Sequence, residues 1–203
     1  MKANTSTKIR LIASALDLCK LAAYVNAGND CAPIGNDTNK FNGDGHTIDN
    51  LQINSSGDYV GLFGYVGNRG TIKNIRLTTV NISGENFVGG FVGYNGGKIS
   101  NCLASGSVNG NETCGGLVGS NSGSIETCTT SGTVNGTNNV GGFVGLNFGR
   151  IQNCTATATV NGDDMVRRVR RLERRHDSKL HVELRGQQHE LCRRVRRYQQ
   201  RTR

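Results

Sequence analysis

Three cysteines recur at one spacing, and they are the first residues whose chemistry could build a site. Cys102, Cys128 and Cys154 are evenly spaced along the chain. A structural zinc site needs four ligands, and this series offers three thiols without a CxxC pair. A disulfide between two of them would leave the third unexplained. Ile75 stands at the corresponding position of an earlier segment, so we predict that the cysteines are buried packing residues, with their disulfide state left open.

The histidines and aspartates supply no complete set for acid–base chemistry or metal binding. His46, next to Asp44 in FNGDGHTI, is predicted to be a turn residue, and the other three histidines lie after residue 165. A His-based triad or metal centre is therefore not expected. Two acidic pairs, Asp44 with Asp49 and Asp163 with Asp164, match neither an EF-hand loop nor a nine-residue calcium repeat. We predict no catalytic residue, no metal ligand, no cofactor-binding residue and no cofactor.

These residues belong to a repeated sequence that must position them. The clearest unit, NFVGGFVGYNGGKISNCLASGSVNG, covers residues 86–110, and further units cover 113–136 and 139–162. A looser unit covers 59–84, with one residue fewer in its glycine segment and two more in the following turn. Each unit has only a few apolar positions, too few to offset the roughly 1–2 kcal/mol that ordering each residue costs. The units must therefore stack on one another.

The pattern within each unit favours short strands. Stretches such as Gly-Phe-Val-Gly and Thr-Val-Asn-Gly alternate, and Gly and Asn can supply left-handed turn conformations. We predict an all-β fold, a parallel β-helix-like β-solenoid of about four coils of ~26 residues, with like residues stacked about 4.8 Å apart. The N-terminal segment instead predicts a short amphipathic capping helix, because its apolar residues fall near one face; these are Leu11, Ala15, Leu18, Ala22 and Val25.

The chain joins two different compositions near residue 165. Residues 1–164 carry 10 Lys and Arg against 11 Asp and Glu, whereas residues 165–203 carry 14 against 4. The domains we predict are therefore an N-terminal helix or cap at 1–30, the solenoid at 31–164 and an Arg-rich tail at 165–203. The tail has little to bury, so we expect it to be disordered or ill-packed. It would attract nucleic acid without base readout.

The tail keeps the repeat spacing while it loses the repeat chemistry. VGGFVG at 140–145 is followed one repeat period later by VRRVRR at 166–171, and after one more period by CRRVRR at 192–197. Glycine codons, GGN, become arginine codons of the CGG type when read one base out of step. A one-base shift lets Arg167 to Leu180 be read back as GGFVGWNGGTIQNC with suitable wobble bases. We therefore hypothesise that the tail consists of frameshifted repeats.

The repeats resemble the GLUG-motif repeat family over roughly residues 9–166. The matching segments are VGLFG at 60–64, GGFVG at 89–93, GGLVG at 115–119 and GGFVG at 141–145. The sequence before them is similar to the opening that the family usually has, although one strand segment between Asp30 and Pro33 is missing. The resemblance implies a secreted or surface-attached bacterial protein. It offers no catalytic residues to carry over.

The function that we predict is non-catalytic. We expect the structural or adhesive repeat region of a bacterial cell-surface or secreted protein, read as a fragment of a longer one. Its expected partners are glycans or host and cell-surface proteins, bound weakly through the solenoid face. One alternative is the repeat region of a larger secreted enzyme, such as a peptidase, without its catalytic domain. Another is nucleic-acid binding through the tail. No apolar run approaches the ~20 residues of a membrane span, and no convincing signal peptide is expected.

Overall fold

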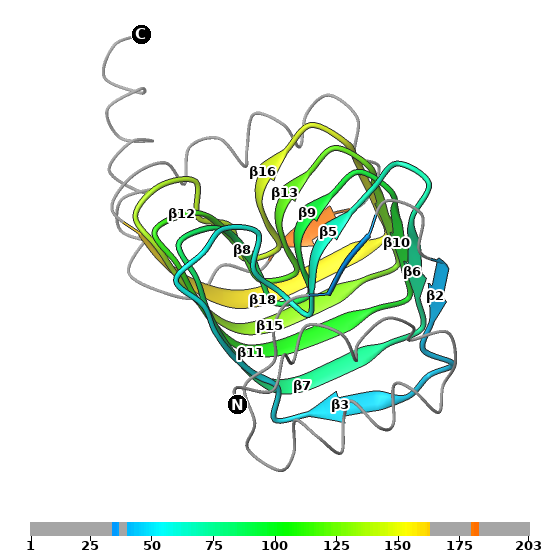
Figure 1. Cartoon of the computed structure of the whole chain (residues 1–203), viewed down its shortest axis with the longest axis horizontal. Helices are drawn as coiled ribbons and strands as arrows, with labels where there is room; N and C mark the ends of the chain where they lie inside the picture. Colours follow the sequence, from blue (N-terminus) through cyan, green and yellow to red (C-terminus); the bar gives the residue numbers. More distant parts are fainter. Residues whose placement is uncertain (1–33, 37–39, 163–179, 183–203) are drawn as a thin grey trace, which may run out of the picture.

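The repeats fold into a parallel β-solenoid, as the sequence predicts. The computed structural model describes residues 34–36, 40–162 and 180–182, with side chains from 40 to 162. Among these residues there are strands and turns but no helix, and none of them forms a helix that could cross a membrane. Figure 1 shows the strands of successive turns lying side by side. The capping helix predicted within 1–30 lies outside the described residues, as do Asp163 and Asp164.

Three parallel sheets, A, B and C, make the walls of the solenoid, and every described turn contributes strands to them in that order; a fourth sheet, D, joins two turns. Sheet A contains β1 (Ile34–Asn36), β5 (Phe63–Val66), β9 (Val92–Asn95), β13 (Val118–Asn121) and β16 (Val144–Asn147). Sheet B contains β2 (Lys40–Asn42), β6 (Thr71–Lys73), β10 (Lys98–Ser100), β14 (Ser124–Glu126) and β17 (Arg150–Gln152).

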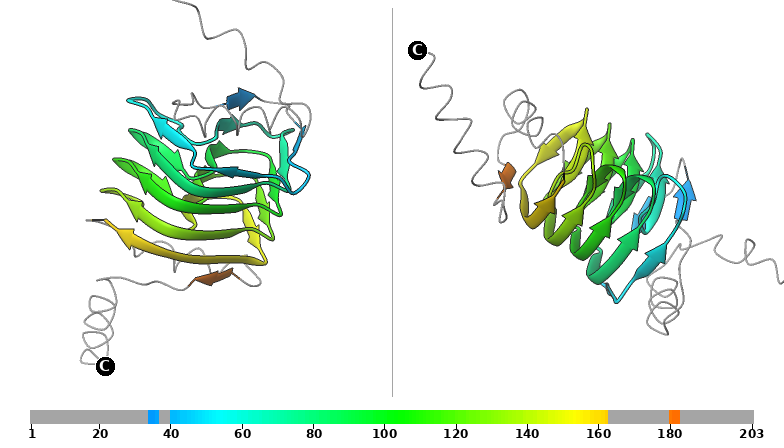
Figure 2. Two further views of the ribbon diagram at one scale, coloured as in Figure 1. Left: turned by 90° about the horizontal axis from the view of Figure 1, so that it is seen from below. Right: turned by 90° about the vertical axis from the view of Figure 1, so that its left-hand side faces the viewer.

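The longest strands form the third wall, sheet C. It contains β3 (Thr47–Asp49), β4 (Gln52–Asn54), β7 (Arg76–Ser83), β11 (Leu103–Asn109), β15 (Thr129–Asn135), β18 (Cys154–Asn161) and β19 (Leu180–Val182). Sheet D is a pair, β8 (Asn86–Gly89) and β12 (Glu112–Gly115). Two further views show the turns stacked in sequence order, from cyan to yellow (Figure 2).

The register between turns follows the regular period of the sequence. Ile99 pairs with Ile125, which pairs with Ile151, and all three side chains are buried. The looser unit differs at three places. Two of these differences, the shorter glycine segment and the longer turn, are visible in the sequence. The third is a bulge in β7, where the pairing with β11 shifts between Ala104 and Gly106. After this bulge the residues of neighbouring turns pair at the regular period, as they do in all later described turns.

The core is one continuous column of buried apolar side chains. Each turn gives it residues from sheets A, B and C, and the column contains every buried hydrophobic residue of the described chain. A single turn could not shield such a set, so the turns depend on one another, as in other repeat proteins. The inner face of each parallel sheet is covered by this column, so the column must continue from turn to turn.

A buried asparagine ladder follows the end of sheet A. Asn95 Nδ2 donates to Asn121 Oδ1 at 2.7 Å, and Asn121 Nδ2 donates to Asn147 Oδ1 at 2.7 Å. Asn95 and Asn121 are fully buried. Oδ1 of Asn95 also accepts from the backbone N–H of Gly97, at 3.1 Å, which fixes the tight turn into β10. Each amide therefore ties its own corner to the next turn.

The paired motif glycines have a role that the sequence prediction did not cover. We expected Gly and Asn to supply left-handed conformations, and Asn101 and Asn153 do so, but none of the paired motif glycines has a positive φ. Some of them must be glycine because there is no room for a side chain. A Cβ on Gly116 would lie 2.2 Å from the carbonyl oxygen of Gly142 in the next turn. At Gly116 the neighbouring turns therefore approach too closely for any side chain.

A short part of the Arg-rich tail differs from the expectation of disorder. β19 pairs in parallel with β18, Cys154 opposite Leu180 and Ala156 opposite Val182. This is again the regular register of the repeats. The two tail residues opposite the buried Cys154 and Ala156 are apolar, which suits a strand at that place. The rest of the tail lies outside the described residues.

Candidate functional site

The three cysteines form a ladder inside the core, as their spacing predicts. Cys102, Cys128 and Cys154 are buried and their thiols are free. The backbone N–H of Cys128 donates to Sγ of Cys154 at 3.4 Å. Ile75 occupies the preceding step and is fully buried. Among the described residues, no group of three or more His, Cys, Asp or Glu side chains could hold a metal ion.

The electrostatics of these thiols suit packing rather than nucleophilic chemistry. The side chain of Cys102 and burial raise the pKa of Cys128 to about 12, against a smaller lowering by Cys154. The pKa of Cys154 is also raised, by Cys128 and by burial. The hydrogen bond from Cys128 lowers the pKa of Cys102. Cys114, in sheet D, pairs with Val88, and burial alone raises its pKa to about 11.

Cys114 is therefore expected to be inert towards alkylating reagents while the protein is folded. Raising the thiol pKa from 9.0 to about 11 lowers the thiolate fraction at pH 8 about 100-fold. Because the thiolate is the nucleophile, iodoacetamide should modify Cys114 at least that much more slowly in the native protein than in guanidinium. Peptide mass spectrometry would measure both rates. Equal rates would show that this thiol is accessible and not part of the core.

The candidate acid–base residues lie in a turn rather than a cleft. Asp44 has a positive φ of 53°, and its backbone N–H donates to Oδ1 of Asn42 at 3.2 Å. The backbone N–H of His46 donates to the carbonyl of Gly43 at 2.9 Å. Asp49 lies further along, where its Oδ1 accepts from the hydroxyl of Thr78 at 2.7 Å. This hydrogen bond is the main cause that lowers the pKa of Asp49.

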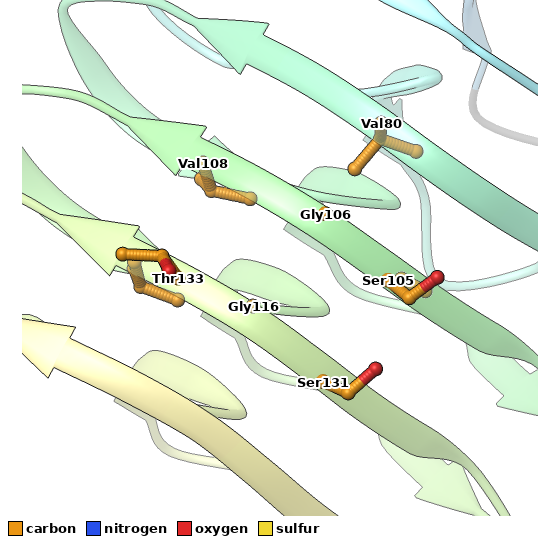
Figure 3. Close-up of a pocket in the computed structure, with 9 residues that line it drawn as sticks. Val80, Ser105, Gly106, Val108, Gly116, Ser131 and Thr133 are labelled. Atoms are coloured by element: carbon orange, nitrogen blue, oxygen red, sulfur yellow. The ribbon is translucent and has the colours of Figure 1, made fainter. Parts of the chain in front are cut away.

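A shallow hollow in sheet C follows from backbone geometry. Gly106 and Gly132 have φ of 136° and 109°. Gly106 lies in β11, which pairs with β7 at the bulge, and Gly132 lies opposite it in β15. Figure 3 shows Ser105 and Ser131 beside them on neighbouring strands. The hollow has no room for a water-sized molecule. It therefore offers no binding cavity for a substrate.

The outer face of sheet C is a regular polar surface. Asn135 Nδ2 donates to Asn109 Oδ1 at 2.6 Å, and Asn161 Nδ2 donates to Asn135 Oδ1 at 2.8 Å. Pairs of Ser and Thr repeat beside them in the same register, such as Ser131 with Thr157. A partner with a repeating structure could contact the same groups on each turn, about 4.8 Å apart.

An aromatic cluster, formed by Tyr59, Tyr65, Phe87 and Tyr94, lies on another wall near the start of the solenoid, where Tyr65 and Tyr94 belong to sheet A and Phe87 to sheet D. Tyr65 stacks on Tyr94 with ring centroids 5.1 Å apart and planes 5° apart. Tyr59 stacks on Phe87 at 4.9 Å and 6°. The two stacks meet at right angles, because Tyr59 and Tyr94 are 6.4 Å and 84° apart. Tyr59 is 43 % exposed and Tyr65 is 41 % exposed.

Sequence reasoning missed this cluster and the buried asparagine ladder. The asparagines were visible, because Asn95, Asn121 and Asn147 follow the cysteine spacing. The tyrosines were not, because the gap that separates Tyr65 from its partner Tyr94 is longer than the regular period. The longer turn and the bulge of the looser unit, which both follow Tyr65, hide that pairing. Only alignment of the turns in space brings the rings together.

Comparison with known proteins agrees with the repeat architecture. A model of "The GLUG motif" matches residues 86–109 and 136–161. The chain is 44% identical over 82 residues to Halomucin of Haloquadratum walsbyi, a match that covers 37% of this chain and 1% of that protein. It is 39% identical over 90 residues to a protein of Evansella cellulosilytica described as a Gly-rich membrane protein, covering 40% of this chain and 10% of that protein.

The chain thus spans a small part of the curated relatives that it matches. No solved structure matches it significantly. The two matched stretches contain the glycine pairs 89/90 and 141/142 and part of the buried column that we have described. The repeats at residues 86–109 and 136–161 match the GLUG motif, which supports assigning this chain to the GLUG-repeat family.

Proposed function

We propose that this chain is a non-catalytic structural and adhesive segment of a secreted or cell-surface protein. The observation that carries the proposal is the in-register stacking of the turns, which repeats the same outward Asn, Ser and Thr groups on each one. Such a wall is stiff, and it presents many weak contacts at once. Its partners are glycans or surface proteins with a repeating structure.

The names of the relatives support this proposal in its coarser form. One relative is named Halomucin and the other is described as a Gly-rich membrane protein, and both names fit a structural protein at a surface. Both are much longer than the matched stretch, so the activity of the whole protein and its bacterial origin remain part of the proposal. The same difference in length is why a larger secreted enzyme is the second candidate. A catalytic motif such as H-E-x-x-H in flanking sequence would favour that enzyme.

Multivalent display tests the adhesive role. The full chain would be biotinylated, bound to streptavidin as a tetramer and applied to an array of glycans and surface proteins. We expect tetramers to bind roughly 10²–10⁴-fold more tightly than the monomer, because weak contacts add through avidity. A tetramer that binds nothing on the array would leave a spacer role and remove the adhesive one.

We also infer that the Arg-rich tail is a frameshifted continuation of the repeats. The arginine pairs keep the spacing of the glycine pairs, which supports this, and so does the pairing of β19 with β18 at the same register. Re-sequencing the DNA from about codon 155 onwards tests it. Repeats that reappear when one base is removed would support a frameshift and a longer parent protein. A confirmed frame would instead make nucleic-acid binding by the tail the leading function, with strong salt dependence.

A further inference from the structure

The charges of the described solenoid are segregated between two sides. All basic residues of the range 40–162 lie in sheet B or within three residues of one of its strands; these are Lys40, Arg69, Lys73, Arg76, Lys98 and Arg150. Three acidic residues lie at the corner near sheet D instead; these are Asp58, Glu85 and Glu112. Figure 1 shows sheets B and D on opposite sides of the solenoid. Sheet B is therefore the basic wall.

The register of sheet B places three of the cations in one straight row. Each member of this row pairs with the next, and we call it the cation row; it consists of Lys40, Thr71, Lys98, Ser124 and Arg150. The residue that follows each of them is buried, so the row itself faces outward. Neighbouring turns lie about 4.8 Å apart, which puts the cations about 10 Å apart with a hydroxyl group between them.

The middle of the cation row is accessible and has described neighbours on both sides. Lys98 lies in β10, which pairs with β6 and with β14. Its side chain is 52 % exposed, and its Nζ lies 3.2 Å from Oε2 of Glu126. An exposed ion pair of this kind contributes little to stability. The ammonium group has three donors, so Lys98 can bind a ligand carboxylate as well as Glu126.

The spacing of the cations selects among polyanions. A single nucleic-acid strand carries one phosphate per about 3.4 Å, so cations about 10 Å apart would leave most of its charges unpaired. Glu126, beside Lys98, would repel the phosphates in between. Among the described residues, the outward positions of sheet B hold no aromatic ring on which bases could stack. A polymer with fewer and regularly spaced carboxylates fits this wall better.

We propose that the cation row binds an extended, β-linked acidic polysaccharide that carries one carboxylate on every second sugar. A sugar in such a chain has nearly the length of one turn, so its carboxylates recur at the spacing of Lys40, Lys98 and Arg150. The hydroxyl groups of Thr71 and Ser124 meet the neutral sugars in between. This assignment rests on the proposed adhesive function and gives it a ligand class and a wall.

Acetylation of lysine amines by an N-hydroxysuccinimide ester, followed by peptide mass spectrometry, tests the row one residue at a time in the full chain. The probe is a hyaluronan decasaccharide, which alternates glucuronate and N-acetylglucosamine, in large excess so that the Arg-rich tail does not deplete it. We expect it to slow acetylation of Lys98 at least about threefold, because a paired carboxylate keeps the amine protonated and unreactive. Lys73, outside the row, is the internal control and should change little.

Two double variants with the same change of net charge separate the row from general attraction. Lys40→Gln with Arg150→Gln removes the outer cations of the row, and it should weaken the binding read from Lys98 about tenfold. Arg69→Gln with Arg76→Gln leaves the row intact and should weaken binding less than about threefold. Circular dichroism should show that both variants keep the fold. Equal losses would mean that only the total charge matters, which would overturn the row.

The remaining outcomes separate the ligand class from the adhesive function. Chitohexaose is neutral, and protection of Lys98 by it would overturn the need for carboxylates. An oligothymidylate that protects Lys98 as strongly as hyaluronan, at the same concentration of negative charge, would favour nucleic acid and overturn the polysaccharide. A decasaccharide that protects no lysine of the row would also overturn the inference, while the tetramer array still decides the adhesive function separately.

Discussion

Gly116→Ala is expected to lower the free energy of unfolding by about 3 kcal/mol, the upper end of what overpacking in a tight interior costs. The new Cβ would lie 2.2 Å from the carbonyl oxygen of Gly142, an atom of the backbone that no rotamer change can move. Relief would require the two turns to separate, which breaks the pairing of sheet A beside them. Urea denaturation followed by circular dichroism would measure the loss.

Gly142→Ala is the matched control for this substitution, because it changes the same motif position one turn later. At Gly142 the nearest atoms to a new Cβ are Cγ2 of Val160 at 3.4 Å and Cβ of Ala158 at 3.5 Å, which is ordinary contact. Its effect should stay within about 0.5 kcal/mol. Equal losses for the two variants would mean that glycine is required for a reason other than the approach of the next turn.

Asn121→Leu is expected to cost about 3 kcal/mol although leucine has a similar size, because leaving a buried polar group without its partner costs about 1–3 kcal/mol. The substitution removes both ladder bonds, so Asn95 Nδ2 and Asn147 Oδ1 each lose their 2.7 Å partner. The same urea titration measures this loss.

Asn161→Ala serves as the control for the ladder. Asn161 is exposed, and its side chain donates one hydrogen bond, to Oδ1 of Asn135 at 2.8 Å. We expect a loss of about 0.5 kcal/mol, as at other exposed positions. If Asn121→Leu were as mild as Asn161→Ala, the amide ladder would contribute little, and apolar packing alone would hold the turns together.

The period of the sequence predicts most of the fold. Ile99, Ile125 and Ile151 indicate the register, and a period that stays constant over three units allows only stacking in register. The cysteine ladder follows from the same argument. The bulge in β7 could not be predicted, because one extra residue in the strand RLTTVNIS leaves no local trace until its neighbours are aligned.

The sequence alone could not reveal the candidate site. Tyr59 and Tyr65 look like ordinary aromatic residues of a Gly-rich stretch, and irregularities of the looser unit lie between each of them and its partner in the next turn. Their stacking on Phe87 and Tyr94 becomes visible only when the two turns are aligned. The need for glycine at Gly116 could not be predicted for a similar reason, since close approach is a property of two turns and not of one.

The constant register also determines how the molecule responds to force. Hydrogen bonds between turns run along the solenoid axis, so tension applied at the two ends of the chain opens them one turn at a time. Each regular turn contributes about 5 Å of folded height and releases about 90 Å of extended chain. A protein with many such turns lengthens in equal steps while the remaining turns stay folded. A repeat protein of this kind therefore takes up a sudden load by unfolding turn by turn, without losing all of its structure at once.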